Sequence, residues 1–205
     1  MEYGNPVEAV IPGVQGRVLT VLARTEAELT MRSVAELAGV SANQATVVIN
    51  RLVRLGLVER RDVGAAALVR LVRENEAARS VLALVDLRDG VLARLAGEAR
   101  KIRPIPTCLA VFGSFARGDA HENSDVDILV VPPPDALADS GQWTEALGQW
   151  ADRAARIAGN PVNLVEATVE ELPRLVRRER APWRTIVDEA VVLIGTLPSE
   201  LSVAS

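Results

Sequence analysis

The chain has 205 residues, 49% of them hydrophobic and 24% charged, with a formal net charge of −4 at pH 7. This length allows one large domain or two small ones, and the hydrophobic fraction is ample for packed cores. The single cysteine, Cys108, excludes an internal disulfide framework and fits a reducing cytoplasm, and no run approaches the roughly 18 apolar residues that a membrane-spanning helix needs.

The negative net charge hides a basic segment. Residues 41–73 hold six arginines and two acidic residues, a net of +4, so the rest of the chain sums to −8. A basic patch on an acidic protein favours one surface for a polyanion. The first residues, with Glu2 and Glu8 and no basic apolar start, do not resemble a signal peptide. We therefore expect a cytoplasmic protein with no membrane partner.

Closely spaced helix starts mark the N-terminal third. Apolar residues at helical spacing predict an amphipathic helix over 14–25. Ser33 and Ser41 each begin a capping-box pattern, with a Glu or Gln three residues on, and Gly39 lies between them where a helix C-cap belongs. The sequence therefore predicts one helix from each serine, joined by a tight turn, which is the spacing of a helix-turn-helix.

The two helices, expected over 33–38 and 41–55, precede a predicted β-hairpin that turns at Asp62-Val63-Gly64. Three helices followed by such a hairpin, over residues 12–73, resemble a winged helix-turn-helix DNA-binding domain. The resemblance implies that the second helix of the motif enters the major groove and that the wing touches the DNA backbone or the minor groove. The residues expected to contact DNA are Asn43, Gln44, Thr46, Asn50, Arg51, Arg54, Arg60 and Arg61, of which the last two are phosphate contacts.

Two alternatives to DNA binding stay open for this domain. Winged helices also serve as dimerisation or protein-docking modules, and exposed arginines are usually only solvated. Capping would occupy Ser41 and Gln44, which weakens their case as DNA readers. A homodimer is the expected assembly.

Residues 74–102 have no strand signal and predict a helical connector, interrupted near Asp89-Gly90. Beyond it, residues 103–197 alternate strand and helix patterns, which indicates an α/β class with a covered sheet. The expected elements are strand 107–112, a short helix from Ser114, strand 125–131, a polar loop over 135–141, helix 142–158, strand 161–166, a helix from Thr168 to about 179, a short helix at Pro182-Trp183 and strand 191–194.

Residues 113–127 carry the most specific pattern of the chain. It consists of Gly113-Ser114, then Arg117-Gly118, then Ser124-Asp125-x-Asp127, with apolar runs before and after it. Strand side chains alternate faces, so the two aspartates are expected on the same side. Two aligned carboxylates facing a backbone phosphate cradle suit a Mg²⁺-nucleotide site.

This pattern, within roughly residues 85–195, resembles the DNA polymerase beta-like nucleotidyltransferases, most of all their minimal branch. The resemblance implies an α+β core with a mixed sheet and transfer of a nucleoside monophosphate from an NTP to an acceptor hydroxyl, with release of pyrophosphate. It places the triphosphate contacts on Gly113 and Ser114 and two Mg²⁺ (or Mn²⁺) ions on the catalytic residues Asp125 and Asp127. The acceptor class, whether protein, RNA or small molecule, stays open.

Other residues near this pattern have two interpretations each. Arg117 and Ser124 are candidates for nucleotide binding, but Arg117 equally fits a salt bridge to a nearby acid such as Asp119 or Glu122. His121 borders the expected site, although a histidine in a surface loop more often has no role there.

The sequence departs from the family pattern at one position. Members usually supply a third acidic residue from a later strand, and the matching position here holds Asn163, whose amide cannot act as a general base at neutral pH. Glu166, three residues on, is expected on the opposite face of the strand. Three possibilities stay open: a slow enzyme, an enzyme with a relocated base, or a nucleotide-binding fold that does not catalyse.

Three functions of the whole protein remain in competition. The first is a nucleotidyltransferase coupled to a winged helix. The second is a DNA-binding transcriptional regulator whose nucleotidyltransferase-like domain senses a nucleotide. The third is one half of a toxin–antitoxin pair with a cognate protein partner, which the resemblance alone implies.

Overall fold

The computed structural model describes residues 1–64, 66–137, 140–176 and 183–197, and the chain divides into two compact units. The N-terminal unit comprises Glu2 and Gly4–Leu87, and the C-terminal unit comprises Met1, Tyr3 and the residues from Arg88 onward. The helical segment between the two expected domains contributes α5 (Glu76–Val85) to the first unit and nearly all of α6 (Leu87–Ala99) to the second.

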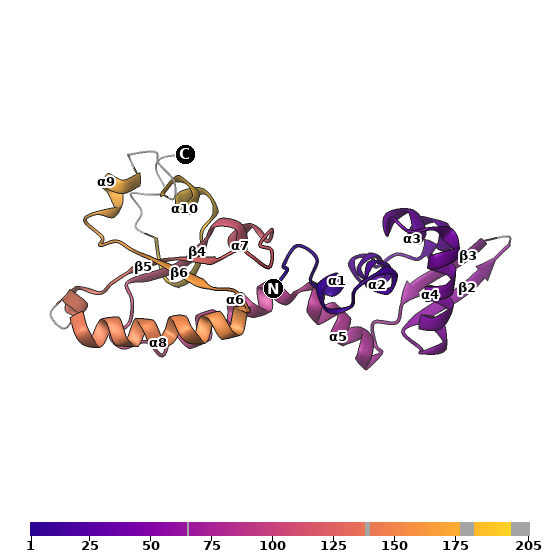
Figure 1. Ribbon diagram of the computed structural model, residues 1–205, viewed down its shortest axis with the longest axis horizontal. Helices are drawn as coiled ribbons and strands as arrows, with labels where there is room; N and C mark the ends of the chain where they lie inside the picture. Colours follow the sequence, from indigo (N-terminus) through magenta and orange to yellow (C-terminus); the bar gives the residue numbers. More distant parts are fainter. Residues whose placement is uncertain (65, 138–139, 177–182, 198–205) are drawn as a thin grey trace. The chain divides into compact units, whose positions relative to one another are not determined.

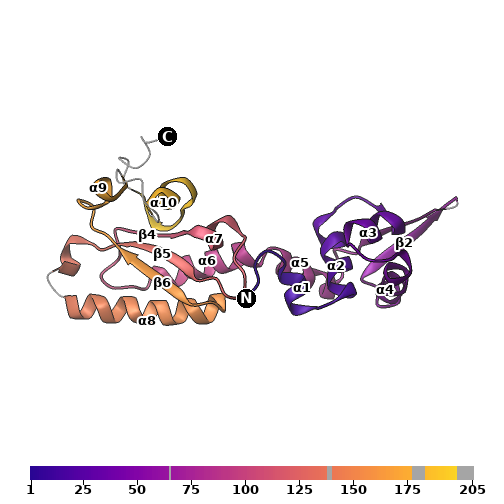
Figure 2. The same cartoon turned by 45° about the horizontal axis from the view of Figure 1, so that its top comes forward.

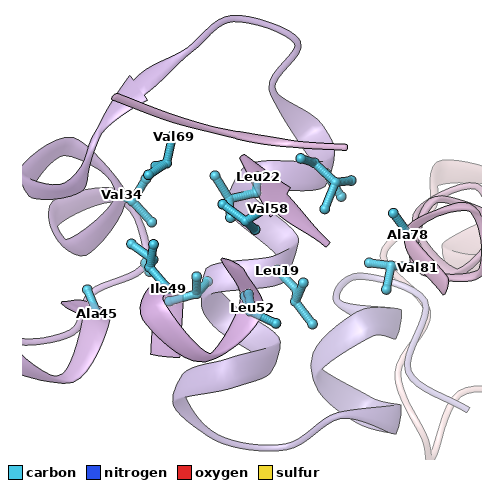
Figure 3. Packing of buried hydrophobic residues seen from close by; sticks show 14 of the residues in the cluster. Leu19, Leu22, Val34, Ala45, Ile49, Leu52, Val58, Val69, Ala78 and Val81 are labelled. Atoms are coloured by element: carbon cyan, nitrogen blue, oxygen red, sulfur yellow. The ribbon is translucent and has the colours of Figure 1, made fainter. Parts of the chain in front are cut away.

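The N-terminal unit packs helices against a small antiparallel sheet. Its strands lie in the order β1-β3-β2, and the β2–β3 hairpin confirms the expected wing. Besides α5, its elements are α1 (Pro6–Val10), α2 (Val14–Arg24), β1 (Leu29–Thr30), α3 (Met31–Leu37), α4 (Ala42–Arg54), β2 (Val58–Val63) and β3 (Ala66–Leu71). Figure 3 shows the core that joins them, with Leu19, Leu22, Val34, Ile49, Leu52, Val58 and Val69 converging and Ala78 and Val81 of α5 beside them.

One of the two predicted capping boxes forms and the other does not. Ser41 Oγ accepts from the Gln44 N–H and Gln44 Oε1 accepts from the Ser41 N–H, as predicted. The prediction of a capping box at Ser33 was wrong, because α3 begins earlier. Its N-cap is Thr30, whose Oγ1 accepts from the Ser33 N–H at 3.0 Å. The reason is tertiary: Thr30 ends β1, which pairs with β3 and fixes an extended residue just before the helix.

The interruption expected near Asp89-Gly90 was also wrong. Gly90 lies inside α6, and the chain instead breaks at Asp86, the C-cap of α5. A single glycine in a helix interior costs only about 1 kcal/mol relative to alanine, which tertiary packing of α6 overcomes.

The C-terminal unit is a four-stranded mixed sheet covered by helices. The strand order is β6-β5-β4-β7, with β5 parallel to β6 and the other neighbours antiparallel, which confirms the expected mixed sheet. Besides α6, its elements are β4 (Cys108–Phe112), α7 (Gly113–Arg117), β5 (Val126–Val131), the 3₁₀ turn η1 (Pro134–Leu137), α8 (Ser140–Ala158), β6 (Val162–Glu166), α9 (Leu172–Val176), α10 (Trp183–Glu189) and β7 (Val191–Gly195).

Helices cover both faces of this sheet. Figure 1 and Figure 2 both show α8 along one face and α9 and α10 over the other. The second face is packed by Leu172 of α9 and Ile186 of α10 against buried residues of β4 and β5. Leu129 belongs to this cluster, and Asp127, two residues earlier on β5, therefore points to the α9–α10 face.

The helices after β5 differ from the sequence predictions in where they begin. The Thr168 capping box forms, with its hydroxyl accepting from the Glu171 N–H at 3.3 Å, but α9 starts only at Leu172. The expected continuation to 179 and the start at Pro182 lie outside the described residues. Part of the expected polar loop is the turn η1, and α8 begins at Ser140 rather than 142.

Among the helices of the described ranges, none is both long and apolar enough to cross a membrane.

Candidate functional site

The Gly113-Ser114 turn begins directly where β4 ends. Phe112, the last residue of β4, pairs with Asp127 of the neighbouring strand. Gly113 has a φ of 72°, and a Cβ at this position would lie 2.9 Å from Asp127 Oδ2. Any other residue would therefore meet both backbone strain and the carboxylate. The missing side chain lets Asp127 approach the backbone of the turn, and Gly113 itself is buried.

The two aspartates lie at the start of β5. Asp125 is exposed just before the strand, and Asp127 is half-buried at its second residue. Val126 between them is fully buried. Because side chains alternate along an extended chain, both carboxylates lie on the side away from Val126. The structure thus brings Gly113 and Asp127 into contact, and strand alternation places Asp125 on the same side.

A buried asparagine fixes the loop that leads into this strand. Asn160 is 3% exposed, and its Nδ2 donates to the carbonyls of His121 and Ser124 at 3.0 and 2.8 Å. Ser124 Oγ in turn accepts from the His121 N–H at 3.0 Å. His121 and Ser124 are therefore engaged in the internal structure of the loop. Sequence reasoning missed Asn160, because an Asn-Pro pair between a helix and a strand indicates an exposed turn.

Asn163 lies directly beside Asp127. The two residues are partners in the parallel register of β5 and β6, and Asn163 Nδ2 donates to Asp127 Oδ1 at 2.9 Å. Glu166 pairs instead with Val130, and its Oε2 accepts from Nε1 of Trp143 in α8 at 3.1 Å. Of the two candidates for a third ligand or base, the structure brings only Asn163 to the aspartates, and Glu166 faces α8 on the opposite side of the sheet.

Arg117, at the end of α7, forms two ion pairs. It contacts Asp119 at 3.2 Å and Glu189 of α10 at 2.6 Å, with its side chain 43% exposed. The salt-bridge interpretation of Arg117 therefore fits the structure. Glu189 had no signal in the sequence, because the contact spans 72 positions.

A second arginine binds the backbone at the C-terminal end of the same short helix. Arg88 Nε donates to the carbonyl of Phe115 at 3.0 Å, and its Nη2 donates to the carbonyl of Ala116. Arg88 thus satisfies the last carbonyls of α7, whose first residues are the Gly113-Ser114 turn. This contact, too, could not be predicted from the sequence, since Arg88 precedes the Gly113-Ser114 motif by 25 positions and is part of no motif that we recognised.

The candidate nucleic-acid surface lies on α4 and the wing. Asn43, Arg51 and Arg54 are exposed, together with Val47, which is 62% exposed. Gln44 is engaged in the capping box, and Thr46 Oγ1 donates to the carbonyl of Ala42. Within the described part of the chain, no ion pair or hydrogen bond involves the side chains of Arg51 and Arg54.

The wing arginines, in contrast, are neutralised by acidic neighbours. Arg60 pairs with Asp62 at 2.9 Å and also reaches Asn50 Oδ1 at 3.4 Å, while Arg61 pairs with Glu28. Because Glu28 lies outside residues 41–73, the charge count of the basic segment did not include it. The available positive charge therefore lies more on α4 than on the wing.

Two family models match the chain. One is described as the MarR family and matches residues 11–67, and the other as a nucleotidyltransferase domain and matches residues 92–190. The chain joins a MarR-family winged-helix domain to a nucleotidyltransferase domain. This confirms the architecture expected from the two sequence patterns.

The comparison with curated proteins gives no significant match. Among solved structures, the chain is similar to a crystal structure of a mutant of the toxin–antitoxin MntA-HpeT, with 22% identity and a TM-score of 0.37. It is also similar to a crystal structure of a toxin–antitoxin with AMP-PNP, with 24% identity and a TM-score of 0.36. Each match covers 53% of this chain and 77% of the other.

The nucleotidyltransferase domain supplies few protein ligands for a metal ion. No group of three or more His, Cys, Asp or Glu side chains comes together in the described ranges. The two aspartates after the glycine turn still fit a divalent cation that shares its oxygen ligands with a nucleotide, since Mg²⁺ is commonly held by one or two carboxylates plus phosphates.

Cys108 is a structural residue of the same domain. It is fully buried in β4, and burial raises the pKa of its thiol to about 11. The thiolate is therefore scarce at neutral pH, which argues against a nucleophilic role for this buried cysteine.

Proposed function

We propose that the nucleotidyltransferase domain binds an NTP with a divalent cation and transfers its nucleoside monophosphate to an acceptor hydroxyl. One observation carries the proposal: Asp127 packs directly against the Gly113 turn, where a Cβ would be 2.9 Å from the carboxylate, so the turn and the carboxylate lie at one place. A bare backbone turn beside two aligned carboxylates is the arrangement that a metal-bound triphosphate requires.

Each residue of the site has a distinct task in this proposal. The Gly113-Ser114 backbone and the Ser114 hydroxyl hold phosphate oxygens, and Arg88 keeps α7 in place behind them. Asp125 and Asp127 hold Mg²⁺ or Mn²⁺, which when bound neutralises charge on the leaving pyrophosphate. Asn163 orients Asp127 but cannot take a proton from the acceptor. We therefore expect slow turnover.

The test has a binding arm and a transfer arm. In calorimetry with Mg²⁺ and a non-hydrolysable NTP analogue, Asp125→Ala with Asp127→Ala should abolish most of the binding that the wild-type protein shows. The matched control is Glu166→Ala, on the opposite face of β6, which should bind as the wild type does. Equal binding by the double aspartate variant would reject this site.

The transfer arm separates an enzyme from a nucleotide sensor. Each labelled NTP is incubated with the protein, Mg²⁺ and a cell extract, and label is sought in protein, RNA and small molecules. Binding without transfer would support the regulator that senses a nucleotide, which the amide at position 163 favours. Label on a protein would identify a partner of the kind expected in a toxin–antitoxin pair.

We also propose that the winged helix binds DNA through α4. The supporting observation is the pair of exposed cations Arg51 and Arg54, which no described acid neutralises, on the helix that such domains place in the major groove. Joint Arg51→Ala and Arg54→Ala should weaken binding more than joint Arg60→Ala and Arg61→Ala, whose charges are already paired.

The measurement is affinity against salt concentration. Each lost phosphate contact should reduce the slope of log K against log salt by about 0.9. Arg79→Ala, an ion-paired arginine on α5, is the control and should leave the slope unchanged. A larger loss from the wing pair, or binding independent of salt, would contradict the assignment of α4.

A further inference from the structure

The two carboxylate oxygens of Asp127 lie in different surroundings. Oδ1 accepts a hydrogen bond from Asn163 Nδ2 at 2.9 Å. Oδ2 is the oxygen that faces Gly113, 2.9 Å from the place a Cβ would take. Asp127 therefore places one oxygen against the turn, and the other is already engaged with an amide.

The backbone enforces this difference. Asn163 and Asp127 are direct partners on adjacent parallel strands, and such strands lie about 4.8 Å apart. Both side chains project to the same face, so a side chain as long as that of Asn or Asp at position 163 lies beside Asp127. The amide satisfies Asp127 Oδ1 with an N–H donor, which cannot ligate a cation, and its remaining oxygen is neutral and a weaker ligand than a carboxylate.

A site for two cations needs more anionic oxygen than this arrangement offers. Two metal ions in such sites lie about 3.5–4 Å apart, so they must share bridging oxygens. A carboxylate bridges two ions only when both of its oxygens are available. The described ranges bring no third carboxylate to Asp125 and Asp127, and Glu166 is turned toward Trp143.

We infer that the site takes a single divalent cation, bound together with the nucleotide phosphates, and that it lacks a second because position 163 holds an amide and not a carboxylate. The inference rests on the proposed function, in which Asp125 and Asp127 hold a metal-bound NTP. It replaces the two ions expected from the sequence by one, with Asp125 and Asp127 Oδ2 as its protein ligands.

The experiment counts Mn²⁺ ions on the full chain with a non-hydrolysable NTP analogue, by calorimetry and by electron paramagnetic resonance. The wild-type protein should bind about one Mn²⁺ per chain, and Asn163→Asp about two, because the new carboxylate adds anionic oxygen beside Asp127. Asn163→Ala frees Oδ1 without adding a ligand and should still bind about one. Glu166→Gln, on the same strand but the other face, is the matched control and should bind as the wild type does.

A melting experiment gives a second readout that does not depend on turnover. Without metal, Asn163→Asp places two carboxylates side by side and should melt below the wild type. Mn²⁺ should then raise its melting temperature by more than it raises that of the wild type, since binding only to the folded state stabilises it.

The outcomes separate the two proposals. About two ions on the wild type would overturn the single-ion inference, and about one on both the wild type and Asn163→Asp would overturn the role of position 163; either result leaves the nucleotide site intact. No binding of Mn²⁺ or nucleotide analogue by the wild type would overturn the proposed function itself. The wild-type count alone stays decisive if Asn163→Asp does not fold.

Discussion

Two constraints, one from the backbone conformation and one from the neighbouring carboxylate, require a glycine at position 113. Its φ of 72° suits glycine, and a Cβ would press on Asp127 Oδ2. Gly113→Ala should therefore cost about 1–3 kcal/mol of folding stability and also displace Asp127, lowering nucleotide affinity. Chemical denaturation measures the first effect and calorimetry the second.

Gly97 provides the matched control for that substitution. It lies in α6 with nothing within 4 Å of a built Cβ, so Gly97→Ala should stabilise the protein by about 0.5–1 kcal/mol and leave nucleotide binding unchanged. If Gly113→Ala bound the nucleotide as tightly as Gly97→Ala, the turn at Gly113 would not form the phosphate site.

Tyr3 offers a pH-dependent prediction, because it is the one tyrosine of the chain. Its hydroxyl donates to the carbonyl of Ala158, its ring contacts Phe115 edge-on, and burial raises its pKa from 10.0 to about 12. Since the folded state favours the neutral phenol, the stability from Tyr3 is complete below pH 10 and is lost as the pH rises from 10 toward 12.

The absorbance of the phenolate measures this titration directly. Its midpoint should lie well above 10 in the folded protein and return to about 10 in denaturant. Tyr3→Phe keeps the ring contact but removes the hydrogen bond, at a cost of about 0.5–1.5 kcal/mol, and should abolish the pH-dependent loss. A folded-state midpoint near 10 would show that Tyr3 is solvated.

At the scale of single elements, α7 depends on its neighbours. A five-residue helix is far too short to be stable alone, and Arg88 satisfies its last carbonyls from α6. Arg88→Ala should remove a charge-assisted hydrogen bond worth about 1.5–3 kcal/mol and shift the Gly113-Ser114 turn. Nucleotide affinity should fall by about tenfold, which calorimetry measures.

Arg94, exposed on the same helix, supplies the comparison for Arg88. Arg94→Ala should leave both stability and nucleotide affinity nearly unchanged. Arg88→Lys keeps the charge but cannot donate to two carbonyls through a planar fork, so it should recover only part of the affinity. Full affinity in Arg88→Ala would mean that β4 and β5 alone position the turn.

Elements defined by local patterns were predictable from the sequence, and those defined by distant contacts were not. The hairpin, the strands β4 to β7 and the Ser41 cap follow from alternation, apolar runs and a short motif. The two-residue strand β1 exists only because β3 pairs with it, and its end at Thr30 took the capping role from Ser33. A two-residue strand has no periodicity to detect.

The candidate site divides in the same way. The opposite faces of Asn163 and Glu166 follow from strand alternation and were predicted correctly, and the same alternation remains the basis for placing Asp125 beside Asp127. That Asn163 donates to Asp127 depends on which strands pair and in which register. The supports from Arg88, Asn160 and Glu189 are side-chain contacts across the fold, for which the sequence carries no pattern.

At the scale of the whole molecule, the two units have separate cores. The hydrophobic cluster of the N-terminal unit and the cluster over the sheet of the C-terminal unit share no residue. All three tryptophans, Trp143, Trp150 and Trp183, lie in the C-terminal unit, whereas helices occur in both. Tryptophan fluorescence therefore reports on one unit, and far-ultraviolet circular dichroism reports on both.

This division predicts a selective effect of core mutations. Leu52, 1% exposed in the N-terminal core, should cost about 2–5 kcal/mol when changed to alanine. In a denaturant titration, Leu52→Ala should move an early part of the circular dichroism transition and leave the fluorescence transition and nucleotide affinity unchanged. Leu129 is fully buried in the C-terminal core. Leu129→Ala should therefore move the fluorescence transition and lower nucleotide affinity, and should leave the part of the circular dichroism transition that reports on the N-terminal unit unchanged. If either variant moved both signals together, the units would unfold as one cooperative body, and the DNA and nucleotide sites would share a single folding equilibrium.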